Sequence, residues 1–175
     1  MLRKYDYRRK LPHIQPDFKA FFITFCTYKR WLLPACARDL VIETCLYGNE
    51  RLFWLYGLVV MPDHVHVVLL SLYDGNGPIS IPEITQAIKG TSAHQVNKLL
   101  GRKGKVWQDE SFDRALRREE SIEAKVNYIL ENPVRAGLVK NPLDYRWLWR
   151  PIKCYEGNPL HGGTGVPARA GVRLS

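Results

Sequence analysis

The feature that most constrains the fold is an apolar stretch over residues 52–72 that a short polar turn divides in two. Residues 51–60 and 64–71 are rich in β-branched and aromatic side chains, and only three residues separate them. Two such segments with so short a connection predict an antiparallel β-hairpin in a buried sheet. Because Pro62 and two histidines interrupt the stretch, no apolar run reaches the roughly 18 residues that cross a bilayer.

The second strand of this hairpin begins with two closely spaced histidines, His64 and His66. Side chains alternate along a strand, so the two imidazoles are expected on one face, a few ångströms apart, with Val65 on the other. Two imidazoles on one face can hold a divalent cation when another element supplies a third ligand. An incidental pair of strand histidines is the alternative, although the apolar neighbours predict a buried strand in which such residues need a reason.

The rest of the chain combines strands and helices, which predicts an α+β domain. Residues 18–28 alternate as a strand does, and residues 106–116 are expected to form a short strand and a turn. Helices are predicted over residues 34–47, 82–100 and 119–131, the last with acidic residues in its first turn and Pro133 as its stop. A hydrophobic content of 46% argues against disorder, and 175 residues are enough for one domain.

One tyrosine of the last predicted helix lies off its apolar stripe. The stripe consists of Ile122, Val126, Ile129 and Leu130. Tyr128 shares the opposite side with Asn132, one turn later, although Pro133 disfavours the α conformation at Asn132. A phenol beside a metal site can act as a covalent nucleophile when a cation helps it to ionise or polarises the electrophile. An amphipathic tyrosine at a helix boundary is the simpler alternative.

The net charge of +9 is concentrated in two blocks. Residues 1–30 carry eight basic and two acidic side chains, a net charge of +6. Residues 89–118 carry eight basic and three acidic side chains, a net charge of +5, whereas residues 31–88 between them are acidic. Such a charge distribution indicates a polyanionic partner, of which nucleic acid is the first candidate.

Three groups of basic residues are candidate DNA contacts. The N-terminal arm carries Arg3, Lys4, Arg8, Arg9 and Lys10, interleaved with two tyrosines that could stack on bases. A glycine-flanked loop carries Arg102, Lys103 and Lys105, and the segment before the tyrosine helix carries Arg114, Arg117 and Arg118. Each group could bind phosphates, and a solvated run of charges is the alternative in each case.

The chain is expected to contain three regions. Residues 1–17 form the basic arm, residues 18–155 form the folded domain, and residues 156–175 form a tail rich in glycine and proline. The four cysteines show neither CxxC pairs nor zinc-finger spacing, so we expect reduced thiols in an intracellular, soluble protein.

Three segments in order resemble a known family. Residues 60–68 (VMPDHVHVV), 106–114 (VWQDESFDR) and 127–139 (NYILENPVRAGLV) are similar to the signature segments of the small single-tyrosine HUH transposases. The segment NPVRAG, residues 132–137, which follows the helix with Tyr128, and the basic arm most resemble those of the REP-associated tyrosine transposases. The resemblance extends over residues 15–150, and the combination of the three segments is far more specific than the histidine pair alone.

The resemblance implies a ferredoxin-like HUH nuclease fold, with a central antiparallel sheet packed with helices. It implies a metal-dependent endonuclease that cuts and rejoins single-stranded DNA at hairpin-forming repetitive extragenic palindromes. Tyr128 would form a 5′-phosphotyrosine intermediate, and His64, His66 and Asn132 would bind Mg²⁺ or Mn²⁺. Such an enzyme would act in the bacterial cytoplasm, at the nucleoid, and a monomer is favoured over a dimer.

Two other functions are consistent with the same features. One is a regulator that binds hairpin DNA without cutting it, and the other is a different HUH nickase, such as a relaxase or a replication initiator. Those nickases are often larger or carry a helicase, and we expect 175 residues to hold the nuclease without one. Asp63 departs from the family pattern, because asparagine is frequent there, and it adds a negative charge beside the histidines.

Overall fold

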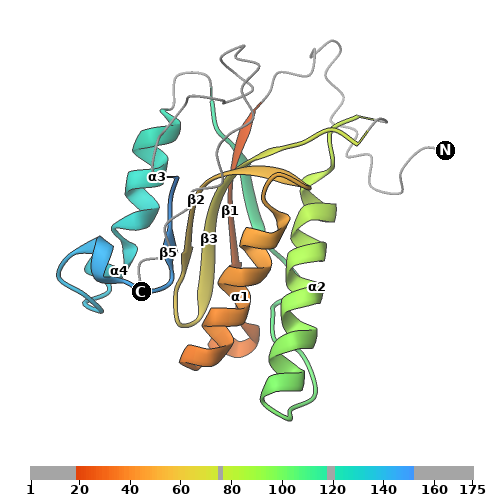
Figure 1. Cartoon of the computed structure of the whole chain (residues 1–175), viewed down its shortest axis with the longest axis vertical. Coiled ribbons are helices and arrows are strands. Elements are labelled where there is room, and N and C mark those ends of the chain that lie inside the picture. Colours follow the sequence, from red (N-terminus) through yellow and green to blue (C-terminus); the bar gives the residue numbers. More distant parts are fainter. Residues whose placement is uncertain (1–18, 75–76, 118–120, 152–175) are drawn as a thin grey trace.

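The computed structural model describes residues 19–74, 77–117 and 121–151, and these residues form one sheet with helices on both faces (Figure 1). The strands are β1 (Ala20–Cys26), β2 (Phe53–Val60), β3 (His64–Ser71), β4 (Phe112–Ala115) and β5 (Leu148–Trp149). The helices are α1 (Ala35–Gly48), α2 (Ile81–Leu99), α3 (Ile122–Leu130) and α4 (Asn132–Arg135), with 3₁₀ turns at Tyr28–Arg30 and Pro142–Asp144. The predicted basic arm and C-terminal tail lie outside the described residues.

The predicted hairpin is confirmed, and it forms the middle of the sheet. All pairings are antiparallel, and the strand order is β4-β1-β3-β2-β5. The turn between β2 and β3 is closed by a hydrogen bond from the Met61 amide to the His64 carbonyl oxygen, 2.8 Å long. On the other side of β3, strand β1 pairs Thr24 with His66 and Cys26 with His64. The histidines therefore lie on a central strand.

Apart from the 3₁₀ turn at Tyr28–Arg30, the chain begins with the order β1-α1-β2-β3-α2-β4, which is the ferredoxin-like arrangement and confirms the α+β fold expected from the sequence. Helices α1 and α2 lie together on one face of the sheet (Figure 1). Their buried residues, such as Val41 and Ile84, pack on alternate residues of the strands, such as Phe25 and Val67. None of the described helices is long and apolar enough to span a membrane.

Helix α3 covers part of the opposite face and packs close to β2. Its apolar stripe is buried as predicted, with Val126, Ile129 and Leu130 packed against residues such as Val68. A β-bulge in β2 shifts the register before Gly57. A Cβ atom on Gly57 would lie 2.9 Å from Val126 Cγ1, closer than real contacts allow. The missing side chain at Gly57 therefore lets α3 approach the sheet.

The structure differs from the prediction at the end of the tyrosine helix. Helix α3 ends at Leu130, before Pro133 is reached. Pro133 itself lies in the first turn of the next helix, α4. Proline is tolerated there because the first amides of a helix have no intrahelical partner. Asn132 is helical although it precedes a proline, contrary to the expected bias. Strand β5 was not predicted, since two residues are too few to show a period.

Candidate active site

The two histidines lie beside each other on the face of the sheet that α3 partly covers. Their ring centroids are 4.7 Å apart with an interplanar angle of 74°, and both side chains are half-buried. Val65 between them is fully buried in the core on the α1 and α2 face. The shared face that strand alternation predicted is confirmed, and the pair lies where β3 begins, at one end of the sheet.

Each imidazole is fixed by a hydrogen bond at its Nδ1 atom. His64 Nδ1 lies 2.6 Å from Asp63 Oδ1, and His66 Nδ1 lies 2.7 Å from Thr24 Oγ1. The Asp63 carboxylate is itself held by Arg30, whose Nη2 is 2.8 Å from Asp63 Oδ2. Histidine ligands of metals are commonly oriented in this way, by a carboxylate or another polar group on the ring nitrogen that does not bind the metal. The arrangement leaves the two Nε2 atoms as the candidate ligands.

The protein holds His66 in its neutral form. Burial, together with the electrostatic effects of His64, Arg135, Arg30 and Lys125, lowers the pKa of His66 to about 3, and burial is the largest of these causes. A neutral imidazole is the form that coordinates a metal ion, since protonation occupies the nitrogen lone pair. The same electrostatics place two cations from the region of α3 and α4, Lys125 and Arg135, close to this histidine.

Tyr128 projects from α3 away from the core, as the sequence predicted. Its side chain is 52% exposed, whereas the neighbouring Ile129 is fully buried. Two cations contact its ring: the Arg135 guanidinium carbon lies 4.4 Å and the Lys125 Nζ lies 4.9 Å from the ring centroid. Arg135 also donates to the Tyr128 carbonyl oxygen. The phenol is therefore accessible to a ligand and lies in a positively charged environment.

A continuous set of contacts connects Tyr128 with the histidines. The Lys125 Nζ lies 4.8 Å from the centroid of the Phe22 ring as well as beside Tyr128. The Phe22 ring in turn stacks on His66, with centroids 5.6 Å apart and an interplanar angle of 30°. The structure thus brings the predicted nucleophile and the two predicted histidine ligands into one region, although Tyr128 and His66 are 62 residues apart in sequence.

Asn132 is connected to Tyr128 by Arg135, which contacts both residues. Its Nδ2 donates to the Ile129 carbonyl oxygen at 3.0 Å, and its Oδ1 accepts a bond from Arg135 Nη2 at 3.1 Å. Within the described part of the chain, no third His, Cys, Asp or Glu completes a metal-binding group with the histidines. An amide oxygen has two lone pairs, so Asn132 Oδ1 can accept from Arg135 and still coordinate a cation. The two imidazoles and this oxygen are donors that a divalent cation accepts.

The candidate DNA contacts separate into four groups. Arg114 pairs with Phe22 across β4 and β1, so it shares the face of the histidines. Arg102 and Lys105 are engaged within the protein, because the Arg102 guanidinium stacks 3.9 Å from the Trp31 ring and Lys105 Nζ lies 2.6 Å from Asp109. Lys103 and Arg117 have exposed side chains. The remaining candidates, Arg3, Lys4, Arg8, Arg9, Lys10 and Arg118, lie outside the described residues.

Several residues of this region were not identified from the sequence. Lys125 and Arg135 could have been found, because Lys125, Tyr128, Asn132 and Arg135 follow one another at intervals of three, four and three residues. Arg30 carried no such signal. It lies in the turn after β1, where Lys29 and Arg30 have positive φ angles of 53° and 57°, and this unusual backbone directs Arg30 back toward Asp63.

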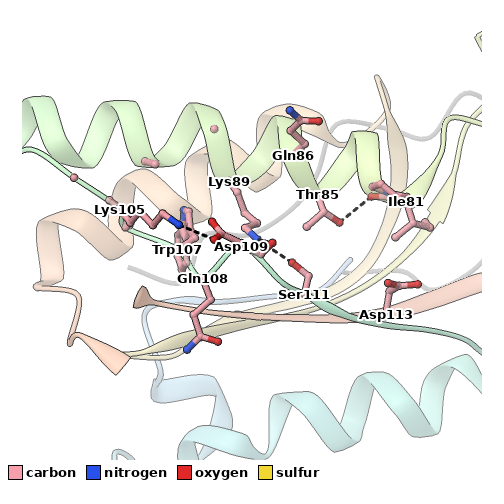
Figure 2. A pocket seen from close by; sticks show the side chains of 15 residues that line it. Ile81, Thr85, Gln86, Lys89, Lys105, Trp107, Gln108, Asp109, Ser111 and Asp113 are labelled. Carbon is pink, nitrogen blue, oxygen red and sulfur yellow. Dashed lines mark hydrogen bonds and ion pairs between the residues drawn. The ribbon is translucent and has the colours of Figure 1, made fainter. Parts of the chain in front are cut away.

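A groove lies elsewhere, between α2 and the segment from Gly104 to Asp113, with a volume of about 620 Å³ (Figure 2). Two of its lysines are engaged within the protein. Lys89 Nζ donates to the Asp109 carbonyl oxygen at 3.0 Å and to Ser111 Oγ at 3.1 Å, and Lys105 Nζ lies 2.6 Å from Asp109 Oδ2. Burial lowers the pKa of Lys89. Neither histidine lines this groove, nor does Tyr128, so it is separate from the candidate active site.

No family model and no curated protein matches the chain. Among solved structures it is similar to a REP-associated tyrosine transposase bound to a REP hairpin, with 23% identity and a TM-score of 0.60 over 79% of this chain and 81% of the other. A candidate transposase from Deinococcus radiodurans R1 is 19% identical (TM-score 0.44; 70% and 97% covered). A bacterial tRNA(His) guanylyltransferase-like protein in complex with GTP is 11% identical (TM-score 0.47; 70% and 63% covered). The first of these similarities shows that the two proteins share a fold.

Proposed function

We propose that this protein is an HUH endonuclease of the REP-associated tyrosine transposase type, which cuts and rejoins single-stranded hairpin DNA with the help of a divalent cation. The observation that carries the proposal is the contact path from His66 through Phe22 and Lys125 to Tyr128. It joins a fixed pair of imidazoles to an exposed phenol. A shared fold with a transposase that binds a REP hairpin supports the same conclusion.

In the proposed reaction the Tyr128 phenolic oxygen attacks the scissile phosphorus. A new bond joins the tyrosine oxygen to the 5′ phosphate, and the bond from phosphorus to the 3′ oxygen breaks. The phenol loses its proton to solvent, and the leaving 3′ oxygen takes one up to become a hydroxyl. Attack by this or another 3′-hydroxyl reverses the step and rejoins DNA, so no energy source is needed.

His64, His66 and Asn132 are the residues that would hold Mg²⁺ or Mn²⁺. Such an ion supplies positive charge that orients and polarises the scissile phosphate. Asp63 and Thr24 keep the two imidazoles in fixed orientations, and this limits the reorganisation needed when the ion binds. Arg135 does the same for Asn132.

The surface next to the site has the chemistry that single-stranded DNA requires. Phe112 on the edge strand β4 is 56% exposed and makes an edge contact with Phe22 at 6.1 Å. Arg114 lies on the same face of β4. Exposed aromatic rings can stack on unpaired bases, while basic groups bind the phosphates. We therefore propose that the single-stranded DNA passes over β4 before it reaches Tyr128.

The residues of the proposed site come from a single chain, since α3 packs on the sheet that carries its own histidines. We propose that the protein acts as a monomer, in the bacterial cytoplasm at the nucleoid. Sedimentation of the protein with and without hairpin DNA would measure this directly, and a complex with two protein chains per hairpin would contradict it.

The function is tested with a 5′-labelled or 3′-labelled oligonucleotide that contains an imperfect palindrome and a short single-stranded flank. Incubation with Mg²⁺ or Mn²⁺ is expected to give a covalent protein–DNA adduct on a denaturing gel, carried by the fragment on the 3′ side of the cut. Chelation with EDTA removes it, and so does Tyr128→Phe. A control oligonucleotide of the same composition that forms no hairpin is expected to react far less.

Two results would contradict the proposal in different ways. Tight hairpin binding without an adduct, under either metal, would favour a regulator that does not cut. Cleavage that depends on an origin-like nick site and ignores the hairpin would favour a relaxase or an initiator.

A further inference from the structure

The side of α3 and α4 that faces away from the core carries a row of polar residues around Tyr128. Lys125 lies one turn before it, and Asn132 and Arg135 follow one and two turns after it. Arg135 has structural partners, because its guanidinium donates to the Tyr128 carbonyl oxygen and to Asn132 Oδ1. Its role is therefore that of a positioning residue, which holds the tyrosine and the amide relative to each other.

Lys125 is placed differently. Its half-buried side chain brings the ammonium group between two aromatic rings, 4.8 Å from the centroid of Phe22 and 4.9 Å from that of Tyr128. Among the described residues this ammonium contacts rings and no carboxylate. Each ring contact contributes about 0.5–1 kcal/mol at an exposed site, which orients the lysine without neutralising it. The result is a positioned charge beside the phenol, which no carboxylate of the described residues neutralises.

We propose that Lys125 is a catalytic residue, which contacts a non-bridging oxygen of the scissile phosphate while Tyr128 attacks. The inference rests on the function proposed above. A phosphodiester carries one negative charge, and attack by an ionised phenol adds a second one to the reacting group. A cation that lies beside the nucleophile and close to His66 stabilises that added charge more than it stabilises the bound substrate.

The test measures adduct formation in a single turnover for Lys125→Gln, Lys125→Arg and the matched control Lys98→Gln. Lys98 lies in the last turn of α2, on the other face of the sheet, so its loss changes the net charge equally. DNA affinity is measured separately by fluorescence anisotropy with the same hairpin. Because the Lys125 side chain ends beside the Phe22 ring, Lys125→Met serves as a second variant, which removes the charge and keeps an unbranched apolar side chain at this position.

We expect the adduct rate at saturating protein to fall about 100-fold in Lys125→Gln and Lys125→Met, and Lys125→Arg to recover part of it. The affinity of all variants should stay within about threefold of the unmodified protein, since one phosphate contact among several is lost. Lys98→Gln should react normally. Circular dichroism and the thermal midpoint verify that each variant is folded.

The outcomes separate this inference from the proposed function. If Lys125→Gln forms the adduct as fast as the unmodified protein, the inference is overturned and the proposed function stands. An affinity loss that accounts for the whole effect, or an equal effect of Lys98→Gln, overturns it as well, because the lysine would then act by general attraction. If the unmodified protein forms no adduct at all, both proposals fail.

Discussion

The two faces of the sheet differ in how completely helices cover them. The face under α1 and α2 is closed and apolar, with side chains such as Val41, Val67 and Ile84 fully buried. The face under α3 is only partly covered, and its open end carries the histidine pair, Thr24 and several cations. Both faces contribute buried apolar clusters to the fold, but only the partly covered face also has an end where polar groups remain accessible for chemistry.

Strand alternation produces this division within single strands. In β1, Ile23 and Phe25 point into the closed core, whereas Phe22 and Thr24 point to the face with the histidines. A central strand therefore contributes to stability and to the site at the same time. A substitution of a residue that points into the closed core should mainly lower stability. A substitution of its neighbour in the strand, which points to the other face, should mainly affect the site.

The largest effect on stability is expected from the closed face. Ile84→Ala removes a fully buried side chain of α2 and should lower the free energy of unfolding by about 2–5 kcal/mol. Adduct formation per folded molecule should be unchanged, because α2 does not contribute to the site. Urea denaturation and single-turnover assays at low temperature measure the two quantities. A folded Ile84→Ala protein that has lost its chemistry would show that the faces are not independent.

The contact between α3 and the sheet should be sensitive to one methyl group. Gly57→Ala places a Cβ atom against Val126 and should cost about 1–3 kcal/mol of stability through overpacking. It should also slow adduct formation, since α3 carries Tyr128. A second substitution, Val126→Ala, should restore part of both losses.

Gly90→Ala is the control for Gly57→Ala, because an added Cβ there meets nothing within 4 Å. Gly90 lies within α2, where alanine should raise stability by about 0.5–1 kcal/mol. Equal behaviour of the two variants in urea denaturation would show that the approach of α3 is not as close as described.

A smaller effect is expected from a buried hydrogen bond on the closed face. Trp107 Nε1 donates to Ser92 Oγ at 3.0 Å, and both residues are buried. Trp107→Phe removes the donor and should cost about 1–3 kcal/mol, at the lower end because Ser92 Oγ still donates to the Ile88 carbonyl oxygen. Thermal unfolding measures this change. If this variant were as stable as the unmodified protein, the hydrogen bond would not contribute to stability.

The smallest perturbation tests burial without changing the fold. Burial raises the pKa of the Cys45 thiol to about 12, so at pH 8 it is protonated and enclosed, whereas Cys36 is exposed. Iodoacetamide should therefore label Cys36 and leave Cys45 unmodified until urea unfolds the protein, as peptide mass spectrometry can show. Equal labelling of both thiols in the native protein would mean that the closed face is not closed.

The sequence was informative wherever a regular period held. Alternation predicted the hairpin and the common face of His64 and His66, and helical spacing predicted that Tyr128 is exposed beside a buried stripe. The period fails at local irregularities: the bulge before Gly57, the two-residue strand β5 and the helical Asn132 each depend on tertiary contacts. The same limit explains Arg30, which reaches Asp63 only because two residues adopt positive φ angles.

If Tyr128 is the nucleophile, the DNA must be attached to this residue after the reaction, and its position on the protein can be measured. The adduct formed with a hairpin oligonucleotide and Mn²⁺ is digested with protease and nuclease, and the modified peptide is sequenced by mass spectrometry. We predict a 5′-phosphonucleotide on Tyr128 and its absence in both Tyr128→Phe and His64→Ala. A nucleotide on any other residue, or an adduct that persists in Tyr128→Phe, would show that Tyr128 is not the nucleophile.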